Sequence, residues 1–137
     1  VHVHPKYSIL FSITNEPITP MHHIGTPFVD GVPVFNHYGL VNNQELGNEL
    51  ANTLSNKYAV LLRNHGIVVV GRDIKEATVL TIWLERNAEL QFYAKILGNA
   101  SPIPLDEARE ISKHYLENSV KQSWDYYASI VLNLKIY

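Results

Sequence analysis

Two short apolar runs separated by a tight turn constrain the fold of this chain more than any other feature. Residues 57–63 read KYAVLLR and residues 66–71 read GIVVVG, with only Asn64 and His65 between them. Runs of this length that are rich in valine, isoleucine and leucine predict buried strands. The sequence therefore predicts an antiparallel pair of strands within the core of the domain.

Helical patterns precede this pair of strands. Ile9, Leu10 and Ile13 stand at helical spacing and predict a first helix. In residues 42–56 leucines recur every four residues, which is typical of an amphipathic helix with one buried stripe. Residues 18–40, between these two patterns, are rich in proline and glycine and predict short strands joined by turns.

A capping pattern predicts a long helix after the strands. Asp73, followed three residues later by Glu76, resembles a capping box, and apolar residues recur at helical spacing until Gly98. A further helical pattern resumes after the proline-containing break at residues 99–104. Strands interleaved with helices predict an α/β layered domain, and the strand pair around the turn favours a mixed sheet.

Composition and charge exclude several classes of function. The chain has 137 residues with a hydrophobic fraction of 46%, as expected for one folded domain. Its 11 basic and 13 acidic side chains give a net charge of -2, which provides no strong field for nucleic acid or an anionic membrane. The absence of cysteine limits any metal site to nitrogen and oxygen ligands and fits a cytoplasmic protein. We expect a soluble protein without nucleic-acid or membrane partners.

The first residues, VHVHP, contain two histidines one residue apart. On an extended strand, His2 and His4 project to the same face and can share one ion. A catalytic zinc site has three protein ligands and one open position. His65 is the best candidate for the third ligand, because a histidine before a glycine at the turn can be aimed at a neighbouring strand end. Spacing alone leaves open the alternative that these are surface or hydrogen-bonded histidines.

The other histidines have weaker claims on such a site. His22 and His23 are adjacent and face opposite ways on a strand, so at most one of them can join His2 and His4. We expect the remaining two, His37 and His114, to be exposed or hydrogen-bonded. The chain also lacks the glycine pattern of nucleotide-binding loops and the nucleophile elbow of serine hydrolases.

In combination, three segments resemble the class II aldolase/adducin family. They are VHVHP at residues 1–5, VLLRNHGIVVVGRDIKEA at residues 60–77 and WLERNAELQFYAKILG at residues 83–98. This family includes fuculose-phosphate and rhamnulose-phosphate aldolases, ribulose-phosphate 4-epimerase and related decarboxylases. The resemblance implies a three-layer α/β/α fold with a central mixed, largely antiparallel sheet. It also implies that the protein forms a homotetramer.

The resemblance also implies a metal centre. His2 and His4 match the H-x-H of the family and His65 matches its H-G histidine, so they are expected to ligate one zinc ion or another divalent metal ion. The metal would stabilise an enediolate formed from a small hydroxy-carbonyl substrate. The acidic general base and the phosphate-binding loops of the family precede its H-x-H. We therefore expect residues 1–137 to be a single domain that lacks its N-terminal part, with the base outside this chain.

One departure affects the predicted reaction. Aldolases of the family carry a tyrosine where this chain has His23, at a position where the proton donor can come from a neighbouring subunit. His23 is therefore a candidate catalytic residue in place of that tyrosine. The resemblance predicts a zinc-dependent carbon–carbon lyase of the sugar-phosphate aldolase type. The alternatives are a decarboxylase of a hydroxylated aromatic or semialdehyde carboxylate, a ribulose-phosphate-type 4-epimerase and a non-catalytic adducin-like structural module.

Overall fold

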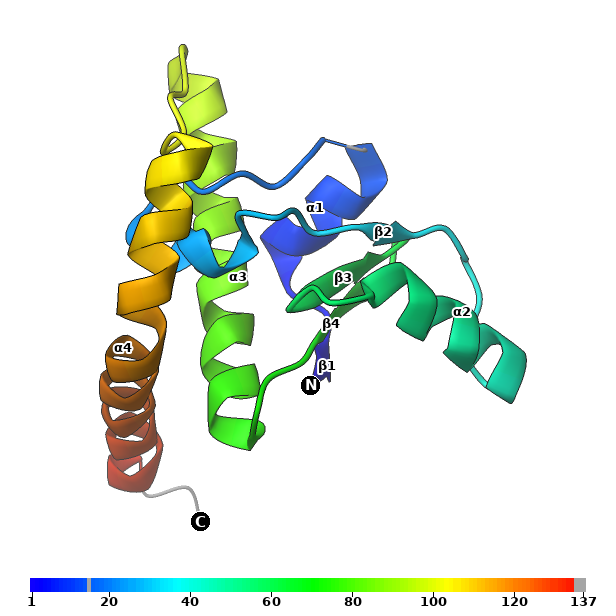
Figure 1. The fold of residues 1–137 in the computed structure, drawn as a ribbon. Helices are drawn as coiled ribbons and strands as arrows, with labels where there is room; N and C mark the ends of the chain where they lie inside the picture. The colour runs from blue at the N-terminus through cyan, green and yellow to red at the C-terminus, as the bar shows by residue number, and fades with distance from the viewer. Residues whose placement is uncertain (15, 135–137) are drawn as a thin grey trace.

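A computed structural model describes residues 1–14 and 16–134 of the chain (Figure 1). The chain alternates short strands with helices, and the long helices come last. In chain order the elements are β1 (His2–Val3), α1 (Lys6–Thr14), the 3-10 helix η1 (His23–Phe28), β2 (Val34–Phe35), α2 (Gln44–Leu54), β3 (Ala59–Leu62), β4 (Gly66–Val69), α3 (Ile74–Leu97) and α4 (Leu105–Asn133).

The four strands form one sheet in the order β1-β4-β3-β2. The predicted pair, β3 and β4, is antiparallel, with Leu62 opposite Gly66. β1 adds to the free side of β4 in the antiparallel sense, with His2 opposite Val68. β2 pairs with β3 in parallel. The sheet is therefore mixed and largely antiparallel, as expected.

Alternate residues of β3 and β4 face opposite helical layers, because successive side chains of a strand point to opposite faces. On one face, Leu61 and Ile67 pack with apolar side chains of α1 and α3. On the other face, Val60 and Leu62 pack with the leucines of α2. Figure 1 shows α2 on one side of the sheet and α3, with α4 alongside it, on the other. The three-layer α/β/α fold is confirmed.

The long helix α3 supplies most of the helical side of the core. Its N-terminus is capped by Asp73, whose carboxylate accepts the backbone N–H of Glu76 at 2.8 Å. The reciprocal half of the predicted capping box differs from expectation, because the Glu76 carboxylate accepts the N–H of Arg72 instead. The helix ends at Gly98, which has a positive φ of 120° that favours glycine. Trp83, in the middle of α3, is 2% exposed.

The predicted first helix is present, but its buried face differs from the expected one. The buried residues are Ser8, Phe11 and Ser12, whereas Ile13 is 47% exposed. Serine hydroxyls are buried when they have hydrogen-bond partners, and both of these have partners outside α1. Polar contacts with other elements therefore decide which face of α1 lies inside.

Residues 16–22, between α1 and η1, form no strand, and of the short strands expected within residues 18–40 the structure has β2 at Val34–Phe35. Two buried amide side chains of α3, Asn87 and Gln91, bind the backbone of residues 16–22 instead. Gln91 accepts the N–H of Thr19 at 2.8 Å and donates to the carbonyl of Pro17 at 2.7 Å. Asn87 accepts the N–H of Met21 at 2.9 Å and donates to the Thr19 carbonyl at 2.9 Å. These bonds satisfy backbone groups that a strand partner would otherwise pair.

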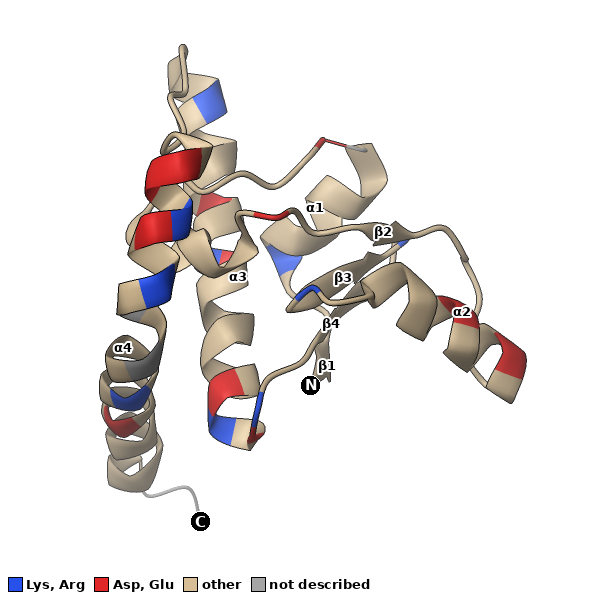
Figure 2. Cartoon of the chain, in the orientation of Figure 1, with Lys and Arg blue, Asp and Glu red and all other residues tan. Residues whose placement is uncertain are grey.

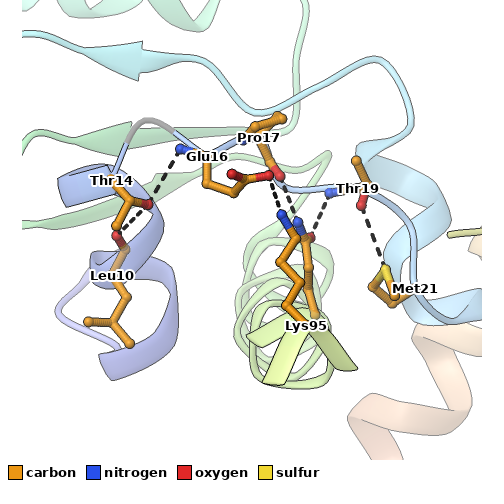
Figure 3. Close-up of polar contacts among 8 residues, drawn as sticks. Leu10, Thr14, Glu16, Pro17, Thr19, Met21 and Lys95 are labelled. Atoms are coloured by element: carbon orange, nitrogen blue, oxygen red, sulfur yellow. Dashed lines mark hydrogen bonds and ion pairs between the residues drawn. The ribbon is translucent and has the colours of Figure 1, made fainter. Parts of the chain in front are cut away.

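Charges of both signs lie along α3 and α4, whereas the charged residues of α2 are acidic (Figure 2). Lys95 near the end of α3 forms an ion pair with Glu16, as Figure 3 shows, and Arg109 of α4 lies 3.4 Å from Asp30. Exposed pairs of this kind contribute little, about 0 to 1 kcal/mol each. Within residues 1–14 and 16–134, no helix is long and apolar enough to cross a membrane.

Candidate metal centre

The first two histidines of the site are His2 in the short strand β1 and His4, which lies directly after that strand. Its backbone is extended, so His2 and His4 project to the same side with Val3 between them. Val3 is half-buried and packs against the core, while both histidine side chains are exposed. The alternation predicted from VHVHP is therefore present, with the apolar residue inward and the imidazoles outward.

The turn between β3 and β4 carries the third histidine. Asn64 adopts a positive φ of 56°, a conformation that asparagine tolerates better than most residues. The N–H of His65 donates to the Leu62 carbonyl at 3.1 Å, which closes the turn. Because β1 is the neighbour of β4, this turn holds His65 beside the end of β1.

The three imidazoles converge through their Nε2 atoms. Nε2 of His4 lies 3.2 Å from Nε2 of His2 and 3.0 Å from Nε2 of His65. In the described part of the chain, these residues form the only group of three or more histidines and carboxylates with ligand atoms close enough to hold an ion. Tetrahedral zinc with Zn–N bonds of about 2.0 to 2.1 Å separates its nitrogens by about 3.3 to 3.4 Å. The spacing of His4 from the other two rings therefore suits one shared cation, and the ligand atoms of all three residues lie within 4.8 Å of one another.

Hydrogen bonding within the cluster cannot satisfy all three rings. A neutral imidazole has one N–H and one acceptor nitrogen. Nδ1 of His2 lies 2.8 Å from the Ile67 carbonyl, which can only accept, so this Nδ1 carries the proton and Nε2 of His2 holds a lone pair. Nε2 of His4 can donate to only one of its two neighbours at a time. A cation among the three lone pairs satisfies all of them, so the donor set fits a metal ion.

The electrostatics of the cluster favour a neutral His65 ring. Burial lowers the pKa of His65, and the nearby His2 and His4 lower this pKa further by charge repulsion. Metal ligation requires neutral imidazole. The protonation state that this environment favours is the one that a metal ligand needs.

Gly66 is a site feature that sequence analysis did not identify. A Cβ at this position would lie 2.5 Å from the Val3 carbonyl oxygen and 2.8 Å from the ring of His4. Only glycine therefore lets β1 pass close enough to bring its histidines to His65. The signal for it in the sequence is the glycine that follows His65, which by itself indicates only a turn.

The other histidines lie outside the cluster. Nδ1 of His22 accepts the N–H of Ile24 at 3.3 Å and caps η1. His23 and His114 line a separate cavity beside α4. Within one chain, His23 therefore does not join the three-histidine group. Its role as a proton donor to a neighbouring subunit stays a prediction.

Acidic side chains do not take part in the three-histidine cluster of the described residues. In the described residues, the potential ligand group consists of three imidazoles without an acidic side chain. Glu85 lies in the middle of α3, and its two carboxylate oxygens accept backbone N–H groups of α1. The general base remains unassigned.

Comparison with known proteins identifies the family. The family model for the class II aldolase and adducin N-terminal domain matches residues 1–92. The chain belongs to the class II aldolase/adducin family. The match contains β1, the β3–β4 turn and most of α3, and therefore all three histidines of the cluster.

Relatives within the class II aldolase/adducin family are named as enzymes of different reactions. The chain is 31% identical over 110 residues to "Decarboxylase NovR" of Streptomyces niveus, covering 80% of this chain and 41% of that protein. It is 29% identical over 115 residues to an L-fuculose phosphate aldolase of Escherichia coli O6:H1, covering 82% of this chain and 51% of that protein. The chain thus spans about half the length of these curated relatives, or less.

A solved structure supports the same fold. The L-fuculose 1-phosphate aldolase from Glaciozyma antarctica PI12 superposes with a TM-score of 0.79 at 24% sequence identity. The superposition covers 95% of this chain and 49% of that one. The class II aldolase fold therefore extends over nearly the whole chain, including elements beyond residue 92.

Proposed function

We propose that this chain acts as a metal-dependent carbon–carbon lyase on a small hydroxy-carbonyl compound, with His2, His4 and His65 as ligands of Zn²⁺ or another divalent ion. The observation that carries the proposal is the convergence of three Nε2 atoms, with Nε2 of His4 within 3.2 Å of the other two. The family match that contains all three histidines supports it.

The ligand residues define what the site can do. His2 and His4 are exposed, so a cation held by the three rings would keep one side open to a substrate. When bound there, the ion supplies Lewis-acid stabilisation of negative charge on substrate oxygens. The hydrogen bond from Nδ1 of His2 to the Ile67 carbonyl fixes the orientation and tautomer of that ring. The chain's own contribution is therefore a preorganised set of three nitrogen ligands.

Metal content tests this proposal directly. We expect one equivalent of zinc or another divalent ion in the purified protein by elemental analysis, and loss of that metal in His65→Ala. His114→Ala is the matched control, because His114 lies outside the cluster and its variant should retain the metal. A wild-type protein without metal affinity would contradict the lyase proposal and favour an adducin-like structural module.

Two reactions are the main candidates once metal binding is established. Aldol cleavage of a sugar phosphate is supported by the aldolase relatives, and decarboxylation is supported by the relative named as a decarboxylase. Formation of dihydroxyacetone phosphate and an aldehyde would indicate an aldolase. Release of CO₂ from a hydroxylated aromatic carboxylate would indicate a decarboxylase. Chelator-treated protein provides the control in both assays, and loss of product after chelation is the expected result.

We also propose that the protein forms a homotetramer, as the family resemblance implies. Its mass in solution, measured by light scattering after size-exclusion chromatography, tests this proposal. A monomer at micromolar concentration would contradict it.

A further inference from the structure

The first turn of α1 receives an unusual contact from α3. The first N–H groups of a helix have no partner within the helix. Here one carboxylate satisfies two of them: Glu85 accepts the N–H of Tyr7 and the N–H of Ser8, both at 2.8 Å. It also accepts the Ser8 hydroxyl at 2.8 Å, and this serine is fully buried. A negative charge at a helix N-terminus is also favoured by the helix dipole.

This contact fixes the chain close to His4. β1 ends at Val3, so His4 and Pro5 lie between the sheet and α1 without strand pairing of their own. α1 has no acidic residue in its first turn to cap itself. Glu85 supplies this cap from a distant part of the sequence and ties the segment after His4 to α3.

The other end of α1 is tied to the turn that carries His65. The Ser12 hydroxyl accepts the N–H of Asn64 at 3.1 Å, and the guanidinium of Arg63 donates to the Ser12 carbonyl. Ser12 itself is fully buried, and both contacts are partly buried. One short helix therefore connects the segment that follows His4 with the residues that precede His65.

We propose that Glu85 is a positioning residue of the three-histidine cluster, which acts by holding α1 so that His4 and His65 keep their relative positions. The inference rests on the proposed metal-binding function. Glu85 does not contact the imidazoles; it acts through the backbone of Tyr7 and Ser8. Ser12 has the same role at the other end of α1, through Asn64.

The test compares Glu85→Gln with Glu49→Gln, which removes an exposed carboxylate of α2. We measure Zn²⁺ affinity by chelator competition and the visible absorption spectrum of the Co²⁺-loaded protein. We expect Glu85→Gln to weaken Zn²⁺ binding about 10- to 100-fold, the range typical of residues that orient metal ligands, and to change the Co²⁺ spectrum. Glu49→Gln should leave both unchanged.

A purely structural role predicts a different pattern. If Glu85 only stabilises the fold, Glu85→Gln lowers the melting temperature but leaves the Co²⁺ spectrum and the Zn²⁺ affinity of the folded protein within twofold of wild type. That result overturns the inference. Ser8→Ala removes only the hydroxyl contact and provides a milder variant should Glu85→Gln fail to fold. A smaller affinity loss in the same direction is expected, and unchanged affinity would contradict the inference.

A readout in metal-free protein separates this inference from the proposed function. Amide hydrogen exchange at Tyr7 and Ser8 reports the Glu85 contact without any metal. Strong protection in wild type that is lost in Glu85→Gln supports the anchor, and equal exchange rates in the two proteins contradict it. Failure of wild-type protein to bind Zn²⁺ would instead remove the proposed function, and with it the positioning role.

Discussion

Replacing Gly66 by alanine tests how closely β1 must approach the turn of the metal centre. A Cβ at Gly66 would lie 2.5 Å from the Val3 carbonyl oxygen, 2.8 Å from Cδ2 of His4 and 3.3 Å from Cε1 of His2. The nearest contact is with backbone, so a change of side-chain rotamer cannot relieve it. β1 itself must move away from β4.

The size of the effect follows from these distances. Ordinary van der Waals contact begins near 3.4 Å, so the Val3 carbonyl must retreat by about 0.9 Å from its 2.5 Å approach. Overpacking of this kind costs about 1 to 3 kcal/mol of folding stability. Metal sites tolerate ligand distances within about 0.2 Å, and the move carries His2 and His4 away from His65. We expect Gly66→Ala to lose at least tenfold in Zn²⁺ affinity, about 1.4 kcal/mol.

Two measurements and one control complete this test. Chelator competition gives the Zn²⁺ affinity, and urea unfolding of metal-free protein gives the folding stability. Gly47→Ala is the matched control, because a Cβ at this helical position of α2 meets open space. It should stabilise the protein by about 0.5 to 1 kcal/mol and leave metal binding unchanged. Wild-type Zn²⁺ affinity in Gly66→Ala would refute the argument that this glycine sets the position of β1.

Two further predictions concern polar contacts. Gly25→Ala places a Cβ 2.1 Å from Oδ1 of the buried Asn87, so we expect the free energy of unfolding, measured in urea, to fall by about 2 to 4 kcal/mol. The same substitution should cost much less stability in an Asn87→Ala background. Equal losses in both backgrounds would contradict the contact. The hydrogen bond with Tyr93, together with burial, raises the pKa of Tyr7 to about 12, so the folded protein keeps a proton that the unfolded chain releases near its ordinary pKa of 10.0. The folding stability is therefore unaffected by this group below pH 10.0 and falls as the pH rises from there toward 12. Ultraviolet titration of Tyr93→Phe should show the Tyr7 pKa returning toward its ordinary value, and an unchanged titration curve would contradict this assignment.

The helix α1 shows where sequence patterns were insufficient. Ile9, Leu10 and Ile13 correctly predict a helix, but they do not identify its buried side. Hydrophobic spacing assumes that apolar side chains face inward. Here Ser8 and Ser12 are fully buried because Glu85 and the β3–β4 turn provide their partners. These partners are distant in the sequence, and no local sequence pattern predicts them.

The candidate site shows the complementary case. The spacing of His2 and His4 placed both rings on one side of a strand, because the two-residue repeat of a strand is a local property. The choice of His65 over the other histidines depended on its position at a turn and on family resemblance. Its proximity to His4 depends on β1 joining β4, a contact between segments more than sixty residues apart. Gly66 acquires its importance only through that contact.

The sequence by itself determined the elements of this protein and the residue types of its site. Strand-sized apolar runs, leucine spacing and capping residues are local signals, and they predict local structure. The tertiary structure decided what those elements meet: which face of α1 is buried, why glycine follows His65, and how Glu85 of α3 reaches the segment after His4. The physical reason is that close packing and buried hydrogen bonds join residues distant in the chain, and their partners are known only once the chain has folded.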